Sequence, residues 1–286
     1  MKKSSDNDTI PSDINKRINE FITQFRSKPI YLPINKQELE NVVEKLFSQM
    51  FPICEIPDNN QSEAELLLIY KILLSNFSRL MEADKAEKII IDFFTKISGI
   101  QQRLYNDAQT FLAHDPAAES LEEIVLTYPG FFALSVHRIA HEFYKMQVPI
   151  IPRLFSEYAH AKVGVDIHPG AKIGDNFFLD HGTGTVIGET TIIGNNVKIY
   201  QGVTLGALFV TKNLSKVKRH PTVEDNVVIY AGATILGGET SIGHDSVIGG
   251  NVWLTHSVEP YTLAYYSSEM KIKTIKDFKE PLNFII

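Results

Sequence analysis

The chain has 286 residues, of which 44% are hydrophobic and 22% are charged, a composition typical of a globular protein with one large domain or two smaller ones. The net charge of −6 argues against a broad nucleic-acid surface, and a single cysteine, Cys54, excludes an intrachain disulfide and argues against a thiolate zinc site. The chain begins without the apolar core of a secretory signal and has no run of about 18 apolar residues, so we expect a cytoplasmic protein that binds no membrane.

The first half of the chain is predicted to be an all-helical domain. After a polar tail at residues 1–12, which we expect to be disordered, apolar residues recur three and four positions apart in segments 38–51 and 86–112. Asp115 before Pro116 is typical of an N-cap followed by a first-turn proline, and Pro129 is well placed to begin another helix. The helical domain is therefore expected to cover residues 13–160.

Near residue 163 the apolar residues begin to recur every six positions, with short offsets between runs. A glycine often follows the apolar residue, where a side chain would crowd a corner. A period of six fits neither a helix nor a simple strand, and it indicates a coil with three short strands per turn, in which each apolar residue points inward and stacks on its counterpart eighteen residues later. Ordinary short strands in a sandwich would not keep this register for so long. The series is Ile167, Ile173, Leu179, Ile187, Ile193, Ile199, Leu205, Val223, Ile229, Ile235, Ile242, Ile248 and Leu254.

Three motifs in this half, "VDIHPGAKIG" (165–174), "LDHGTGTVIGET" (179–190) and "RHP" (219–221), closely resemble bacterial serine O-acetyltransferase, of the hexapeptide-repeat acyltransferases. The resemblance covers residues from about 105 to 258. It implies an α+β fold, in which the all-helical domain precedes a left-handed parallel β-helix at 161–258 and a C-terminal tail at 259–286; that handedness is an exception to the usual crossover rule. It also implies transfer of acetyl from acetyl-CoA to the L-serine hydroxyl, giving O-acetylserine for cysteine biosynthesis.

Acetyl transfer to a hydroxyl requires a general base, and His181 is our candidate. It lies in "LDHGTG", where the six-residue register slips, so its ring can project from a loop, and a neutral imidazole suits the task. The resemblance implies that Asp166 accepts a hydrogen bond from the other ring nitrogen and fixes the tautomer. The alternative is a loop histidine bonded to a nearby carbonyl.

The resemblance also supplies anchors for the acceptor. Arg219 would bind the serine carboxylate through two parallel hydrogen bonds, and His220 would lie beside the acceptor as a catalytic and binding residue. Asp180 and Asp115 would face the serine ammonium, so the site would join both domains. A helix cap at Asp115 and a solvated loop arginine at 219 are the alternatives.

For the donor, small residues of the coil leave room for a pantetheine arm against backbone amides. Gly206, Ala231 and Gly232 are the expected walls, and Lys218, with Lys212 and Lys216, could meet the phosphates. Because family members bind acetyl-CoA between the subunits of a trimer, the resemblance implies a homotrimer and leaves pairing into a hexamer open.

Two segments depart from the family pattern. The loop at 207–218 is longer and bulkier than the family's glycine-rich loop, and the usual "G-V-P-A" turn after the last coil is missing, which leaves the far wall of the donor groove unassigned. The terminal Ile286 matches the tail with which family members bind O-acetylserine sulfhydrylase, and this partner is a hypothesis. No metal is expected, because His137 and His141 share a helix face without a third ligand.

Two other functions stay open. One is a hexapeptide acyltransferase acting on another hydroxylated acceptor, and the other is a non-catalytic regulatory scaffold. Arg219 with two aspartates favours a zwitterionic acceptor over a sugar, and His181, Asp166 and His220 together favour an enzyme over a scaffold.

Overall fold

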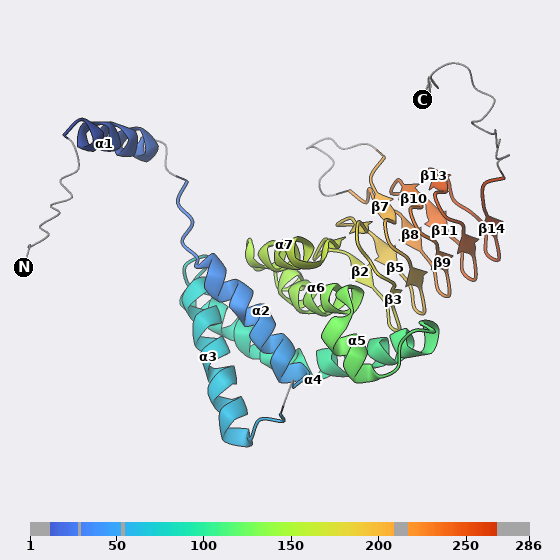
Figure 1. The fold of residues 1–286 in the computed structure, drawn as a ribbon, viewed down its shortest axis with the longest axis horizontal. Helices are drawn as coiled ribbons and strands as arrows, with labels where there is room; N and C mark the ends of the chain where they lie inside the picture. Colours follow the sequence, from blue (N-terminus) through green and yellow to red (C-terminus); the bar gives the residue numbers. More distant parts are fainter. Residues whose placement is uncertain (1–11, 28–29, 53–54, 209–216, 268–286) are drawn as a thin grey trace, which may run out of the picture.

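The computed structural model describes residues 12–27, 30–52, 55–208 and 217–267. Some predictions therefore fall outside the described residues: the disorder of the N-terminal tail and those that concern Cys54, Lys212, Lys216 and Ile286. Within these ranges, helices come first and short strands follow (Figure 1). The helices are α1 (Ser12–Arg26), α2 (Lys36–Met50), α3 (Asn59–Phe77), α4 (Ala83–His114), α5 (Leu121–Thr127), α6 (Pro129–Lys145) and α7 (Ile151–Val163).

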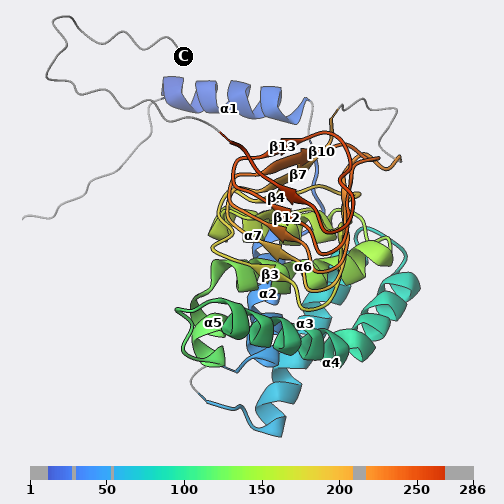
Figure 2. The same cartoon turned by 90° about the vertical axis from the view of Figure 1, so that its right-hand side faces the viewer.

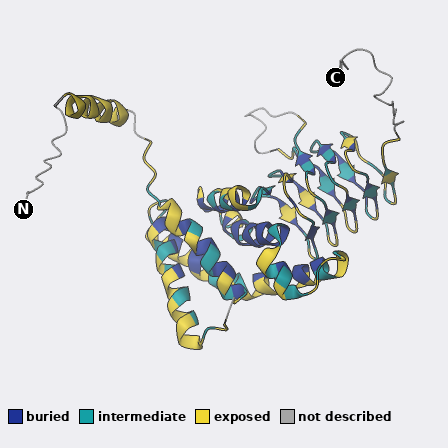
Figure 3. Ribbon diagram, in the orientation of Figure 1, coloured by how far each residue is buried: buried dark blue, intermediate teal, exposed yellow. Residues whose placement is uncertain are grey.

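The helix ends follow from local sequence. Asp58 and Gln61 form a reciprocal capping box at the start of α3, and Pro129 occupies the first turn of α6, as the sequence predicted. Gly164 takes the left-handed conformation that ends α7. Helix α6 is the most deeply buried of these helices (Figure 3), and α4, α6 and α7 all contact the first strands of the coil. None of the described helices is long and apolar enough to cross a bilayer.

The predicted role of Asp115 as an N-cap is wrong. Asp115 is instead the residue that ends α4, and its side chain accepts a hydrogen bond from the amide of Ala117 at 2.8 Å. The cap of the next helix is Ser120, whose hydroxyl accepts from the amide of Glu123. A serine followed three residues later by glutamate is a strong start signal, and it outcompetes the Asp-Pro pair because α5 begins only at Leu121.

The strands form three parallel sheets that wind into a left-handed β-helix. Sheet A has the order β1-β4-β7-β10-β13, sheet B β2-β5-β8-β11, and sheet C β3-β6-β9-β12-β14. Figure 2 looks along this coil, so that successive turns lie one behind another. The strands are β1 (Asp166–Ile167), β2 (Lys172–Ile173), β3 (Phe178–Leu179), β4 (Val186–Ile187), β5 (Ile192–Ile193), β6 (Lys198–Ile199), β7 (Thr204–Gly206), β8 (Thr222–Val223), β9 (Val228–Ile229), β10 (Thr234–Leu236), β11 (Ser241–Ile242), β12 (Val247–Ile248), β13 (Trp253–Leu254) and β14 (Leu263–Ala264).

The predicted inward series is confirmed, because every member except the partly buried Leu254 is buried. The uniform stacking distance is wrong, however. Stacked partners lie 18 residues apart for Ile187 and Leu205, but 20 apart for Ile167 and Ile187 and 30 apart for Leu205 and Ile235. Insertions at the corners cause the difference, and β14 carries the coil past residue 258 to Ala264.

A buried ion pair seats the helices on the first turn of the coil. Arg138 of α6 donates to the carboxylate of Asp107 on α4 at 2.7 Å and to the carbonyl of Gly174 at 3.0 Å. The same carboxylate accepts from the amide of Phe177 at 3.1 Å. Close by, Gly130 lies in the first turn of α6, where an added Cβ would lie 2.0 Å from the carbonyl oxygen of Leu179. These contacts set α4 and α6 against the segment of the first turn that runs from the end of β2 through β3.

Candidate active site

The corner between sheets C and A carries the first group of predicted residues. His181 lies in the loop from β3 to β4 with a φ of 53°, a left-handed conformation that is uncommon outside glycine. The two extra residues of this loop move the inward position to Thr185, which is buried, while the side chain of His181 is 71% exposed. Its Nε2 lies 3.7 Å from Oδ2 of Asp180. A strained backbone that projects an imidazole into solvent supports a functional role for this loop.

Asp115 reaches the same corner from the helical domain. The Tyr128 hydroxyl donates to its carboxylate at 2.5 Å, which lowers the pKa of Asp115 and raises the pKa of Tyr128 to about 12; the charge of His181 lowers the pKa of Asp115 further. Burial raises the pKa of Asp180. The charge of His181 opposes this increase, and the charge of Asp115 adds to it. Asp115, Asp180 and His181 are therefore within electrostatic reach of one another, and two carboxylates beside one imidazole suit a small cation such as an ammonium group.

The corner between sheets A and B carries the second group. Arg219 forms an ion pair with Glu189, whose other carboxylate oxygen accepts from the Tyr144 hydroxyl at 2.8 Å. Burial alone would raise the pKa of Glu189, but the hydrogen bonds from Arg219 and Tyr144 hold it below its ordinary value. The Glu189 carboxylate therefore orients the Arg219 guanidinium at the corner between sheets A and B.

His220 is fixed beside Arg219 by the backbone. Its Nδ1 accepts a hydrogen bond from the amide of Thr190 at 3.0 Å, and the ring packs where a side chain at Gly188 would be, since an added Cβ would lie 2.0 Å from it. Burial, followed by the charge of Arg219, lowers the pKa of His220 to about 4. The ring is therefore neutral at pH 7, and because Nδ1 accepts, the proton lies on Nε2, which can donate to a bound group.

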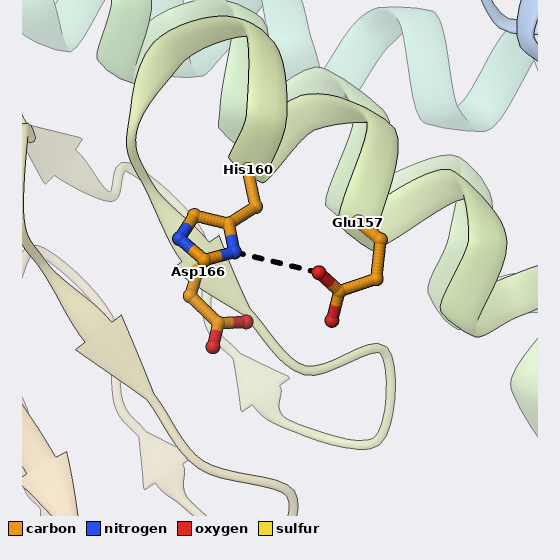
Figure 4. Close-up of side chains that lie close together, drawn as sticks. All are labelled: Glu157, His160 and Asp166. Carbon is orange, nitrogen blue, oxygen red and sulfur yellow. Dashed lines mark hydrogen bonds and ion pairs between the residues drawn. The ribbon is translucent and has the colours of Figure 1, made fainter.

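Asp166 lies with residues of α7. Its carboxylate, the Glu157 carboxylate and the His160 ring place their ligand atoms within 4.8 Å of one another (Figure 4). The guanidinium of Arg153 pairs with Glu157 and lies 3.9 Å from Asp166. Arg153 therefore already provides a positive charge beside both carboxylates. The expected hydrogen bond from His181 to Asp166 stays a prediction.

The expected donor residues fall at two places. Ala231 and Gly232 lie at the corner between sheets C and A, and Gly206 ends strand β7. Lys218 lies at the other corner, where its ammonium donates to the carbonyls of Thr190 and His220 at 3.1 and 2.7 Å and burial lowers its pKa. Lys218 therefore helps to hold the His220 loop, and its contact with phosphates stays a prediction.

The two helix histidines are packing residues in this structure. His137 is buried, and burial lowers its pKa well below the ordinary value. Nδ1 of His141 lies 2.8 Å from the carbonyl of Pro169. Sequence reasoning missed three other residues, Tyr128, Tyr144 and Thr190, which bind Asp115, Glu189 and His220. Only Thr190 lies within a quoted motif; Tyr128 contacts Asp115 within the helical domain, and Tyr144 reaches Glu189 through the docking of α6 on the coil.

Comparisons with known proteins agree with the motifs. Residues 59–136 match the family described as "Serine acetyltransferase, N-terminal". A plasmid serine acetyltransferase of Synechococcus elongatus is 48% identical over 178 residues, which are 60% of this chain and 56% of that protein. The serine acetyltransferase of Bacillus licheniformis is 44% identical over 63% of this chain and 82% of that protein.

Solved structures agree as well. Serine acetyltransferase isoform 3 of Entamoeba histolytica, crystallised with cysteine, superposes with a TM-score of 0.74 and 32% identity over 92% of this chain and 96% of that one. The Neisseria gonorrhoeae enzyme in complex with serine gives a TM-score of 0.57 and 26% identity over 88% of each chain. The fold, the two polar corners and these relatives together lead to one conclusion: the chain belongs to the serine acetyltransferase family of acyltransferases, as its motifs predicted.

Proposed function

We propose that this chain transfers the acetyl group of acetyl-CoA to the hydroxyl of L-serine, giving O-acetylserine for cysteine biosynthesis. One observation carries the assignment of residues: Asp115 of the helical domain lies beside Asp180 and the exposed His181 at one corner of the coil. These residues can hold the ammonium group of a hydroxy amino acid next to an exposed imidazole. A general base is then positioned beside the acceptor.

His181 accepts the proton of the serine hydroxyl as its oxygen attacks the thioester carbon, and returns that proton to the departing thiolate of coenzyme A. Arg219 binds the serine carboxylate, and Nε2 of His220 donates a hydrogen bond beside it. Backbone amides at the corner would stabilise the oxyanion. Asp166 is proposed to orient His181, which requires its carboxylate to leave the α7 contacts.

A complete site of this kind needs two copies of the chain. Asp180 and His181 lie at one edge of sheet A, and Arg219 and His220 lie at the other. One side of the coil takes about six residues, so the two edges are roughly 15–20 Å apart. Since the ammonium and carboxylate of serine share one carbon atom, one serine cannot bridge that distance. A homotrimer in which one edge meets the opposite edge of the next copy supplies both halves, and this supports the expected trimer.

The donor is placed at the same seam. Gly184, Gly202 and Gly232 stack at the corner between sheets C and A, with an added Cβ on Gly202 only 3.6 Å from Gly232. The glycines carry no side chains of their own, so the strip can accept a pantetheine arm beside Ala231 and lead it to His181, with the Asn251 side chain bordering the strip at Gly232. Gly206 and Lys218 stay proposed donor contacts. The cytoplasmic location, hexamer formation and the sulfhydrylase partner at Ile286 stay predictions.

Acetyl-CoA consumption with serine, homoserine and a panel of sugars tests the activity. In the same assay, His181→Asn removes the imidazole while keeping a residue that tolerates φ of 53°, and we expect turnover to fall about 100-fold or more. His244→Asn, an exposed histidine at the corner between sheets B and C, is the matched control. Near-normal turnover in His181→Asn would reject the base, a preference for sugars would favour the other acyltransferase, and no consumption with any acceptor would favour the scaffold.

A further inference from the structure

One side chain from each turn of the coil forms a column along the corner between sheets C and A. The positions are equivalent because each backbone amide donates to the next turn: Asp180 to Ile199, Tyr200 to Ile229, Tyr230 to Ile248, and Gly249 to Ala264. The rings of Tyr200 and Tyr230 are stacked with centroids 5.0 Å apart and planes within 12°. That separation is close to the strand spacing of about 4.8 Å, so one ring fills one turn.

The column is interrupted directly after Tyr230. The next position is Gly249, which has no side chain, and the one after it is Tyr265. Tyr200 covers one face of the Tyr230 ring, the next position of the column in the backbone register is the glycine, and Tyr230 is 44% exposed. Tyr265 borders the same position, since an added Cβ on Gly249 would lie 3.1 Å from its Cβ, and it is 68% exposed. A flat group inserted at Gly249 would therefore continue the stack.

We propose that Tyr230 is an aromatic platform for a planar heteroaromatic ring, and that in this enzyme the ring is the adenine of acetyl-CoA. Every nucleobase has a face that stacks on a tyrosine, so the platform requires no hydrogen-bond partner for recognition. The ligand assignment rests on the proposed function, because the donor is the adenine-bearing molecule of that reaction.

The position of the platform matches the shape of the donor. Asp180 and Gly249 are three turns apart, or about 14 Å, which the long pantetheine and diphosphate arm can span between the thioester and the base. The strip of stacked glycines lies along this same corner, with backbone alone at Gly184 and Gly202 and with the Asn251 side chain bordering Gly232, where an added Cβ would lie 2.4 Å from its Oδ1. Ala231 and Gly232, which follow Tyr230 directly, are already proposed walls for that arm.

The test compares two donors, of which only one carries the adenine. Tyr230→Ala is assayed with acetyl-CoA and with acetyl-pantetheine, which carries the thioester and the pantetheine but neither the diphosphate nor the adenosine. We expect KM for acetyl-CoA to rise about tenfold, in line with the loss of one base–aromatic stack, while kinetics with acetyl-pantetheine stay unchanged. Tyr230→Trp keeps a flat ring and should retain a low KM. Tyr261→Ala, an exposed tyrosine at the corner between sheets B and C, is the matched control and should match the wild type.

The other outcomes separate the two proposals. If the wild type consumes neither donor with serine, the proposed function fails. If the wild type is active and Tyr230→Ala keeps its KM for acetyl-CoA, the platform is rejected. An equal loss with both donors, or loss of the oligomer in light scattering, would assign the ring to folding or subunit packing and would also overturn the proposal.

Discussion

Removing the carboxylate of Asp107 should destabilise the protein more than any surface substitution. Asp107 is fully buried and Arg138 is 5% exposed, so the pair is withdrawn from water and depends on its own contacts. Asp107→Ala leaves the Arg138 guanidinium without its counter-charge and the amide of Phe177 without its acceptor. Breaking a buried pair in this way costs about 3–5 kcal/mol of unfolding free energy.

That cost predicts a large thermal shift. At about 2–4 °C per kcal/mol for a chain of this size class, the melting temperature of Asp107→Ala should fall by roughly 10 °C. The double variant Asp107→Leu with Arg138→Met removes both charges and replaces them with apolar groups. It should lose much less than the sum of the single variants, because no unpaired charge stays buried.

The chain offers a matched control at the same contact. Arg103 and Asp175 also join α4 to the first turn of the coil, at 2.6 Å, but both are exposed. Asp175→Ala should therefore cost no more than about 1 kcal/mol. Urea midpoints and thermal melts of Asp107→Ala, Asp175→Ala, the double variant and its two single components measure these differences. A loss below 1 kcal/mol in Asp107→Ala, or strict additivity in the double variant, would refute the reasoning.

Two further predictions concern the coil. Burial holds the pKa of His220 in the folded protein at about 4, below the ordinary 6.5. Between these two pH values the unfolded chain binds more protons than the folded protein, so the neutral His220 contributes its full stabilisation above pH 6.5 and loses it as the pH falls to about 4. His220→Asn should show a smaller drop in urea midpoint between pH 7.5 and pH 5 than the wild type, and an equal drop would contradict the assignment. Asn196 has a φ of 56° and its amide group bridges Asn176 and Asn226 at 2.9 and 3.0 Å. Asn196→Ala should cost about 1–2 kcal/mol in urea unfolding and Asn196→Gly less, and equal losses would reject the backbone argument.

The coil could be predicted because its signal is local and repeated. Each turn needs an inward apolar residue at the same place. The inward positions of Ile229 and Ile248 can therefore be predicted without knowing which residues they contact. The distance between stacked partners could not be predicted in the same way, because corners accept insertions without disturbing the strands. In the loop from β3 to β4, for example, two added residues place the buried residue at Thr185 and leave β4 in register.

The site could be predicted only as far as it lies inside motifs. His181, Arg219 and His220 are read from short segments. Tyr128 reaches Asp115 between the start of α6 and the end of α4, and Tyr144 reaches Glu189 through the docking of α6 on the coil. The buried Asp107–Arg138 pair escaped notice for the same reason, since a charged residue on a helix gives no local sign that it will be buried. Contacts between segments far apart in sequence carry no periodic signal.

The register slip between β3 and β4 connects the fold to the chemistry. Where the repeat is regular, the residue after the inward position lies in the corner column, as Tyr200 and Tyr230 do. After Asp180 the two added residues force a left-handed turn at His181, and the ring points outward while Thr185 restores the inward series. The imidazole is held outward at one edge of sheet A, and Arg219, the proposed carboxylate-binding arginine, lies at the opposite edge. A ring of copies closed by threefold symmetry joins unlike edges at every seam, which a twofold contact of like edges would not do. Because His181 and Arg219 lie at opposite edges of sheet A on one coil, the proposed site favours a cyclic trimer over a dimer as the smallest active unit.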